Sequence, residues 1–571
     1  MKHFPSLAFS TIFLLFLNAC GGGGSSDTSA GTIIPDDNTT FPNAVPHDAS
    51  FLSDHFSGSD NCVNCHSNIK DENGTDVSLV NAWQGTLMAN SATDPLYLAK
   101  VASEVQRNPD YKEAIETKCS RCHLPMANVE AGFAGDPIAM SGVDSFLDPL
   151  NPHYDAAKDG VSCTLCHQIE NNTTTLGTFD GFSGGFQIAD HEGVERKIYG
   201  PYQDPKTGPM ATSQNKVDFT PVYSEHMRDS KHCATCHNLD TPVIRADGNL
   251  TDPIQHFPEQ AVYTEWEYSD FNDSGKLAQS CQECHMPLAE GDVVISTMGN
   301  VGPREPFRQH KFLGANTYML EILKNNRVKL GAVAGEARFE ESIIDTKEFL
   351  KTAAYVNISD VNFESGTLSF DVNVTNHSGH KFPTSLPTRR IWLHVKVTNN
   401  NNETVFESGS INSQGQIIGV DDNTEDYEPH YTDINDPSQV QVYESIMADT
   451  DGKHTYTFMN AASYLKDNRI LPKGFNKNNV PPTIQTFGAA QNDDDFVGGS
   501  DTVEYEVSSL NSDDQYTITV TLKYQTASYG FMQDLYKDLN LTEVALMKVL
   551  DDTTTNHFED ISTDTETIIL D

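Results

Sequence analysis

Cys62-Val-Asn-Cys65-His66 is the first copy of a pattern, Cys-x-x-Cys-His, that recurs along this chain up to residue 285. The pattern occurs five times, as Cys62-Val-Asn-Cys65-His66, Cys119-Ser-Arg-Cys122-His123, Cys163-Thr-Leu-Cys166-His167, Cys233-Ala-Thr-Cys236-His237 and Cys281-Gln-Glu-Cys284-His285. These motifs use all but one of the 11 cysteines. Each copy places two thiols about one helical turn apart, with an imidazole directly after the second thiol.

This spacing is typical of c-type haem attachment. The two thiols add across the haem vinyl groups, and the following imidazole is placed under the iron as the proximal axial ligand. A single copy could equally be a zinc knuckle or a redox dithiol. Zinc ribbons need no following His, however, and redox pairs do not come in fives. We therefore predict five covalent haems on the ten motif cysteines, with His66, His123, His167, His237 and His285 as proximal ligands.

The start of the chain reads as an export signal. Lys2 is followed by an apolar stretch at residues 7–17 that is too short for a comfortable membrane span. Leu17-Asn18-Ala19-Cys20 resembles a bacterial lipoprotein box, so we predict a signal peptide at 1–19 and a lipidated Cys20. The alternative is an ordinary signal peptide with a chance cysteine. The prediction implies an outer-membrane lipoprotein that faces the periplasm or the cell surface and is attached to the membrane only through its lipid.

Residues 20–46 comprise the lipidated cysteine and a segment that is largely Gly, Ser, Thr, Asp and Pro, which predicts a flexible linker. Residues 47–345 hold the five motifs, with too little chain per motif for separate globules. We expect a loop-rich α domain whose core is built largely by the haems. Residues 97–118 and 316–329 are the clearest helix candidates because their apolar residues recur at helical spacing.

The pattern changes after residue 350. Residues 365–375, 391–397 and 516–522 alternate apolar and polar side chains, and Asn- and Gly-rich turns separate such runs. This pattern is typical of strands with one buried face. The expected fold class is α+β multidomain: the haem-packed α domain at 47–345, followed by a haem-free, antiparallel β-sandwich at 350–571.

The charge of the chain restricts its partners. The formal net charge is −44, which excludes electrostatic binding to nucleic acid or to an anionic membrane face. Solubility in a salty medium is the simpler explanation, and attraction of cations, metal ions or basic proteins is the functional one. Asp421-Asp422-Asn423 and Asp493-Asp494-Asp495 offer hard oxygen ligands for calcium, although solvated loops explain them better.

The sixth ligand of each iron decides between an electron carrier and an enzyme, because an iron with two imidazoles is closed to substrate. His55 and His226 each lie seven residues before a motif cysteine, within the repeated patterns Ser-Asp-His and Ser-Glu-His. His153 follows an Asn-Pro turn ten residues before Cys163. These three are predicted distal ligands; the alternative for each is a surface or packing role. The weaker candidates are His191, His232, His256 and His377.

Several segments resemble a family of multihaem cytochromes c related to cytochrome c554 and the hydroxylamine oxidoreductases. The resemblance spans about residues 50–545 and rests on residues 83–97, 199–202, 224–238, 259–287, 310–316, 377–384, 467–475 and 522–525. The last three segments resemble the β-domain of such proteins in metal-respiring bacteria. The resemblance implies electron transfer across or outside the cell envelope, with envelope redox proteins as partners and an extracellular metal or other acceptor.

The resemblance also favours His310 and His380 as distal ligands, and Gly379 allows the backbone beside His380 to approach a haem edge closely. We therefore expect a lipid-anchored pentahaem cytochrome that carries electrons through stacked haems. The runner-up is an oxidoreductase acting on nitrite or hydroxylamine. The related nitrite reductases usually replace one haem His with Lys, and all five motifs here end in His. A third possibility makes the β-domain an adhesion or docking module.

Overall fold

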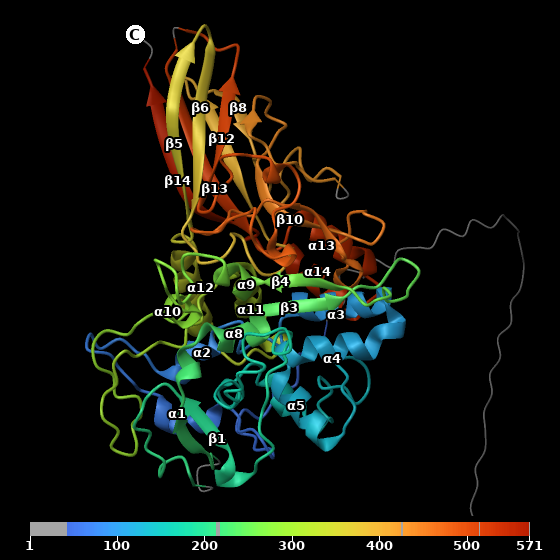
Figure 1. Cartoon of the computed structure of the whole chain (residues 1–571), viewed down its shortest axis with the longest axis vertical. Helices are drawn as coiled ribbons and strands as arrows, with labels where there is room; N and C mark the ends of the chain where they lie inside the picture. Colours follow the sequence, from blue (N-terminus) through green and yellow to red (C-terminus); the bar gives the residue numbers. More distant parts are fainter. Residues whose placement is uncertain (1–40, 42, 213–216, 424–425, 513, 570–571) are drawn as a thin grey trace, which may run out of the picture.

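The computed structural model describes residues 41, 43–212, 217–423, 426–512 and 514–569. Helices and long loops form one end of the elongated molecule, and β-sheets form the other (Figure 1). The predicted signal peptide and Cys20 lie outside the described residues. Within the described residues, no helix has the length and apolarity needed to cross a membrane.

The motif-bearing part consists of short helices, as the sequence predicts. They are α1 (Asp60–His66), α2 (Leu79–Gln84), α3 (Pro95–Arg107), α4 (Lys112–His123), α5 (Pro125–Ala134), α6 (Tyr154–Lys158), α7 (Cys163–Cys166), α8 (Ser230–His237), α9 (Val262–Glu267), α10 (Cys281–His285), α11 (Thr317–Leu330) and α12 (Glu336–Leu350). The helix expected over 97–118 is split into α3 and α4, because Pro109 disfavours a helical conformation at Asn108. The other expected helix is α11, capped by the Asn316 side chain.

Two small sheets lie among these helices. The strands β1 (Lys197–Gly200) and β2 (Thr220–Tyr223) pair in parallel. The strands β3 (Asn238–Pro242) and β4 (His256–Ala261) form an antiparallel pair that leads from α8 into α9. The second pair therefore links the fourth motif to the helix that precedes the fifth.

Beyond residue 350 the structure contains two larger sheets. One has the order β5 (Ala354–Glu364), β6 (Thr367–Asn376), β12 (Ser500–Val507), β9 (Asp433–Ile434). The other has the order β11 (Ser463–Asp467), β10 (Val442–Ala448), β7 (Arg390–Thr398), β13 (Tyr516–Gln525), β14 (Glu559–Ile568), with β8 (Thr404–Ser408) also on β7. All these pairings are antiparallel except that between β9 and β12.

The two larger sheets share one apolar core. Side chains of β6 alternate between half-buried and buried along its whole length, as its sequence pattern predicts. Its buried residues Phe370 and Val372 belong to the same cluster as Val395 of β7 and Val520 of β13. Burial of these apolar side chains in one cluster stabilises this part of the chain.

Two helices lie where the sequence analysis expects only strands. They are α13 (Tyr529–Leu535) and α14 (Thr542–Asp552), and their apolar residues include Val544, Met547 and Leu550 at helical spacing. Both helices pack with α3, α11 and α12 in a second apolar core. Helices α13 and α14 lie beside α3, where the two ends of the molecule meet (Figure 1). The part after residue 350 is therefore tied to the motif-bearing part by a shared core.

The shared core predicts a large effect for a single substitution on α12. Phe339 is 0% exposed and packs in the cluster that contains residues of α13 and α14. We expect Phe339→Ala to lower the free energy of unfolding by about 3–5 kcal/mol through lost burial and the cavity left behind. Denaturant unfolding followed by circular dichroism measures this. The control is Val328→Ala on α11, where the side chain is 66% exposed. A loss below about 1 kcal/mol in Phe339→Ala would show that the shared core does not stabilise the molecule.

Candidate haem-binding site

All five Cys-x-x-Cys-His motifs form helical turns, in α1, α4, α7, α8 and α10. Side-chain caps start two of these helices. Asp229 accepts a hydrogen bond from the Lys231 N–H at the start of α8, and Ser280 and Glu283 form a capping box at the start of α10. The motif His ends its helix or directly follows it. The helical turn therefore brings the two thiols together and leaves the imidazole at the end of the helix.

Thiols of different motifs meet in the interior. Three thiol–thiol hydrogen bonds join Cys62 with Cys163, Cys122 with Cys236, and Cys233 with Cys281. These hydrogen bonds, together with burial, raise the pKa of Cys62, Cys122 and Cys233 well above the usual value for a thiol. None of the ten described cysteines forms a disulfide. These contacts join the first motif to the third, and the second to the fourth and fifth, while Cys166 of the third motif acts electrostatically on Cys233 and Cys236 of the fourth. The thiols of all five motifs therefore lie close together, which suits attachment of closely packed prosthetic groups.

Three motif histidines are held in one tautomer by backbone carbonyls. The Nδ1–H of His66 donates to Ile295 O over 2.8 Å, that of His167 to Tyr199 O over 2.6 Å, and that of His285 to Leu313 O over 2.5 Å. Nε2 then carries the lone pair. Burial lowers the pKa of all three imidazoles, so they are neutral at pH 7. A neutral imidazole oriented through its other nitrogen is the usual state of a metal-binding His.

The other two motif histidines are also neutral. Burial lowers the pKa of both His123 and His237 to about 4. The His123 ring stacks on Tyr97, with ring centres 3.5 Å apart and planes 5° apart. Its buried Nδ1 has no hydrogen-bond partner among the described residues. Tyr97 therefore fixes the plane of this ring without occupying its nitrogens.

Two predicted distal ligands lie opposite motif histidines. The ring centres of His167 and His310 are 6.2 Å apart with planes 13° apart, and those of His285 and His380 are 6.3 Å apart with planes 15° apart. Two metal–nitrogen bonds of about 2 Å, plus about 1 Å from each nitrogen to its ring centre, add up to about 6 Å. The spacing of both pairs fits two imidazoles on one metal ion.

His55, unlike His310 and His380, contacts two carboxylates. Its Nδ1 lies 2.9 Å from Glu130 Oε2, and its Nε2 lies 3.2 Å from Asp190 Oδ1. Its ring also stacks on Phe133, with ring centres 4.2 Å apart. Glu130 is buried, whereas the Asp190 side chain is 76% exposed. His55 therefore has a buried carboxylate partner at Nδ1 and a solvent-exposed carboxylate partner at Nε2.

His226 and His153 are also engaged with protein partners. His226 is buried; the Ser224 hydroxyl donates to its Nδ1 over 2.6 Å, and its Nε2–H donates to Ile169 O over 2.9 Å. His153 places Nε2 2.8 Å from Asp136 Oδ2, and its ring meets Phe146 edge-on. The described structure does not pair either ring with a motif His.

Two further histidines have the burial expected of ligands. The Nε2 of His47 is buried without a hydrogen bond, 3.7 Å from Asp159 Oδ1, and Asp159 acts electrostatically on Cys62. The Nδ1 of His232 is likewise buried without a partner, and burial lowers the pKa of this imidazole to about 3. From the sequence, His232 is one of the weaker candidates and His47 is not a candidate. No local pattern marks His47, because its surroundings come from residues more than 100 positions away.

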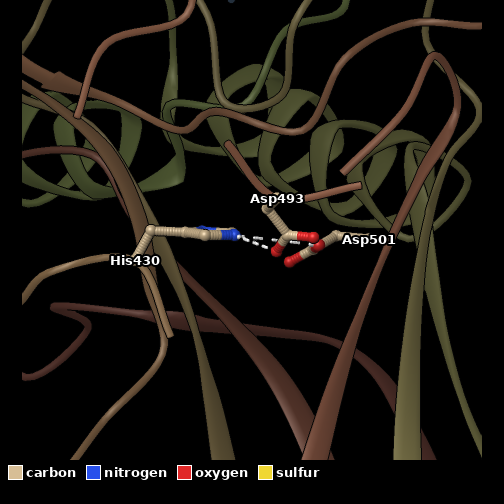
Figure 2. A group of neighbouring side chains, drawn as sticks. All are labelled: His430, Asp493 and Asp501. Atoms are coloured by element: carbon tan, nitrogen blue, oxygen red, sulfur yellow. Dashed lines mark hydrogen bonds and ion pairs between the residues drawn. The ribbon is translucent and has the colours of Figure 1, made fainter. Parts of the chain in front are cut away.

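A separate His–Asp–Asp group lies between the two larger sheets. His430 Nε2 is 2.9 Å from Asp493 Oδ2 and 3.9 Å from Asp501 Oδ1 (Figure 2). All three residues are buried, and their ligand atoms are close enough together to hold a metal ion. The protonation state of His430 decides whether they are available to a metal.

The neighbours of His430 place its proton on Nε2. Gln441 Nε2 and Asn468 Nδ2 both donate to His430 Nδ1, over 3.0 and 3.1 Å. The orientation of both amides is set by backbone donors, since Tyr431 N–H donates to the Gln441 oxygen and Glu444 N–H to the Asn468 oxygen. Nε2–H therefore donates to Asp493 and is not available as a metal ligand. This arrangement favours a hydrogen-bond network over a metal site.

The two acidic clusters considered for calcium already have protein partners. Arg390 binds both carboxylate oxygens of Asp421, over 2.8 and 2.6 Å, and Asp493 accepts from His430. Calcium at these clusters stays a prediction that the geometry does not favour, because the first carboxylate of each cluster is engaged with a cationic or N–H group.

A comparison with known proteins finds a solved structure with a similar fold. No family model matches the chain, and no curated protein matches it. A solved structure described as a penta-heme cytochrome c552 from Thermochromatium tepidum matches with a TM-score of 0.51 and 14% sequence identity. The match covers 90% of this chain and 99% of that one. The chain therefore has a multihaem cytochrome c fold, in agreement with the fold implied by its motifs.

The buried acid of the His–Asp–Asp group predicts a pH effect on stability. Burial raises the pKa of Asp501 to about 8, against about 3.9 for an unfolded Asp. Between these values the folded state binds more protons than the unfolded state, so stability falls as the pH rises. Raising the pH from about 6.5 to about 8 therefore lowers the free energy of unfolding by about 2 kcal/mol through Asp501.

We expect Asp501→Asn to remove this part of the pH dependence. The measurement is denaturant unfolding at both pH values, compared with wild type and with the exposed neighbour variant Asp494→Asn. Wild type and Asp494→Asn should lose equal stability between the two pH values, and Asp501→Asn should lose about 2 kcal/mol less. Equal losses in all three proteins would show that Asp501 is not protonated in the fold.

Proposed function

We propose that this chain is an exported, lipid-anchored pentahaem cytochrome c that carries electrons through closely packed haems. The observation that carries the proposal is the meeting of thiols from different motifs, since Cys62 contacts Cys163, and Cys236 contacts Cys122. Groups attached to contacting motifs lie close to one another, which an electron carrier needs. The fold shared with a penta-heme cytochrome c552 supports the same proposal.

In this proposal, different residues would attach the haems, bind the irons and orient the ligands. The ten motif cysteines attach the haems, and the five motif histidines bind the irons from the proximal side. When bound, haem c supplies one-electron redox chemistry. The backbone carbonyls of Ile295, Tyr199 and Leu313 orient three proximal imidazoles and increase their basicity. Desolvation by the surrounding protein lowers the pKa of the five motif imidazoles and keeps them neutral.

The distal side favours a carrier over an enzyme. His310 is proposed as the second ligand opposite His167, and His380 as the second ligand opposite His285. An iron bound by two imidazoles is closed to substrate. His55, His153 and His226 are proposed for the remaining irons; each must first give up a hydrogen bond at Nε2. For His55 that partner is the exposed Asp190, which can turn into solvent.

The part after residue 350 is proposed to be a β-sandwich that supplies His380 to the haem-binding part. The family related to cytochrome c554 and the hydroxylamine oxidoreductases is the proposed relationship, and its members suggest envelope redox proteins as partners. A net charge of −44 favours basic partner proteins or metal ions at the surface. The proposed location is the outer membrane, facing the periplasm or the cell surface, with an extracellular metal or another acceptor receiving the electrons.

Ligand removal tests the carrier function. In protein shown by mass spectrometry to hold five covalent haems, electron paramagnetic resonance of the oxidised form should show low-spin iron only. His310→Ala and His380→Ala should each convert one haem to high spin, because each removes one distal imidazole, and the double variant should convert two. The control is His394→Ala, whose ring is bound to Glu407 on β8 and should leave all haems low spin.

Two results would overturn the proposal of a five-haem electron carrier. Fewer than five haems in fully matured protein would show that one motif has another role. A high-spin iron in the wild type that binds nitrite or hydroxylamine and turns it over would establish the alternative, an oxidoreductase acting on a small nitrogen compound.

The membrane anchor has a separate test. Replacing Cys20 with Ser removes the lipid acceptor, so we expect Cys20→Ser to move from the membrane fraction to the soluble exported fraction with all haems in place. Haem absorbance in the two fractions measures the distribution. Asn18→Ala keeps the cysteine and should stay with the membrane. Retention of Cys20→Ser in the membrane fraction would show that the anchor lies elsewhere.

A further inference from the structure

We propose that a buried cluster of four charged side chains, Glu265, Lys381, Asp467 and Arg469, is the device that holds His380 opposite His285. The proposal deepens the proposed function, because it rests on His285 and His380 binding one iron. It assigns these four residues a positioning role, and it makes the region after residue 350 responsible for closing one haem.

Hydrogen bonds hold both the imidazole ring and the backbone carbonyl of His380. His380 Nδ1–H donates to Lys381 O over 2.9 Å, so Nε2 is directed away from this contact. The carbonyl of His380 accepts from Asn376 Nδ2 and from the Ser378 hydroxyl, each over 2.8 Å. The position of the imidazole therefore depends on where the segment 376–381 is fixed.

The charged cluster fixes that segment. Lys381 Nζ lies 2.7 Å from Asp467 Oδ2, Arg469 Nη2 lies 2.8 Å from the same oxygen, and Arg469 Nη1 lies 2.9 Å from Glu265 Oε1. Glu265 Oε2 accepts from the Lys381 backbone N–H over 3.2 Å and from the Thr384 hydroxyl over 2.7 Å. The contacts form a closed ring of two cations and two anions around the residue next to His380.

The four residues come from two parts of the chain. Glu265 lies on α9 in the motif-bearing part, and the other three lie after residue 350. Trp266, the next residue on α9, donates from Nε1 to Gln279 O, just before the fifth motif. A Cβ at Gly379 would lie 3.2 Å from Trp266 Cδ1, so the loop carrying His380 packs directly on α9. The cluster therefore links the fifth motif to the loop that supplies its partner imidazole.

A stabilising role does not explain this cluster. Glu265 and Lys381 are 0% exposed, Asp467 2% and Arg469 7%. Buried ion pairs lose hydration on folding, and apolar residues of similar size are often as stable in their place. Charge-assisted hydrogen bonds do impose a narrow geometry, especially through the planar fork of Arg, and the fork of Arg469 binds both oxygens of Asp467. Its contact with Glu265 Oε1 is an ion pair without hydrogen-bond geometry. Because the ring of contacts closes on the Lys381 N–H, that geometry is transmitted to His380.

The test measures how many reduced irons bind carbon monoxide, since a haem with two imidazoles does not take it up. Relative to wild type, His380→Ala should add one binding haem per chain. Glu265→Gln should add about a tenth of an equivalent or more, because His380 leaves its place in part of the population. The same variant should shift the reduction potential of one haem and leave four unchanged. Arg469→Lys keeps the charge without the planar fork. Its number of haems that bind carbon monoxide should fall between those of Glu265→Gln and wild type.

Arg107→Gln is the matched control. Arg107 of α3 also pairs across the molecule, with Asp534 of α13 over 2.6 Å and Asp538 over 2.8 Å, but away from His380. It should lower stability without adding a binding haem. If Glu265→Gln does not fold, the pair Glu265→Gln with Arg469→Met removes one charge of each sign and should also add binding.

The outcomes separate the two proposals. If His380→Ala adds no binding haem, the pairing of His285 with His380 is wrong and the proposed function loses that ligand. If His380→Ala adds one haem while Glu265→Gln or the double variant adds none, the positioning role is overturned and the ligand pair stands. If Arg107→Gln opens a haem to the same extent as Glu265→Gln, the effect reflects general loosening of the molecule and the positioning role is again overturned.

Discussion

The contact between thiols of different motifs is the constraint on which the rest of the structure depends. Five short helices cannot bury enough apolar surface to form separate cores, so they converge on one interior. Their cysteines meet there, as Cys62 does with Cys163. The long loops between motifs follow from this convergence, because they connect helices that lie close in space and far apart in sequence.

Backbone carbonyls from distant loops set the chemistry of the motif imidazoles. His66 donates to Ile295, 229 positions away, and His285 donates to Leu313. Each contact selects the tautomer with its lone pair on Nε2, and burial keeps the ring neutral. The loops that appear structureless in sequence therefore have a specific function, since they place single carbonyls behind single rings. This explains how a loop-rich domain can hold its motif imidazoles, the proposed metal ligands, in a defined geometry.

Local features were predictable from sequence, and long-range partners were not. The motif helices, α11 and the alternating strand β6 follow from spacing and periodicity. The repeat singled out His55 and His226 as distal ligands, which stays a prediction; both residues are buried. It could not show that Glu130 and Ile169 would hold their ring nitrogens, because these partners lie 75 and 57 positions away. Helices α13 and α14 were missed because the strands around them dominated the pattern.

The region after residue 350 has its clearest connection to electron transfer through His380. A β domain that only docked a partner would need few contacts with the motif-bearing part. Here it shares an apolar core with α3, α11 and α12 and places His380 beside His285. A change in how the two parts pack would move that imidazole, and an iron that loses an axial imidazole changes its potential and its access to small ligands. If His285 and His380 bind one iron as proposed, the packing between the two parts is coupled to the potential of that haem.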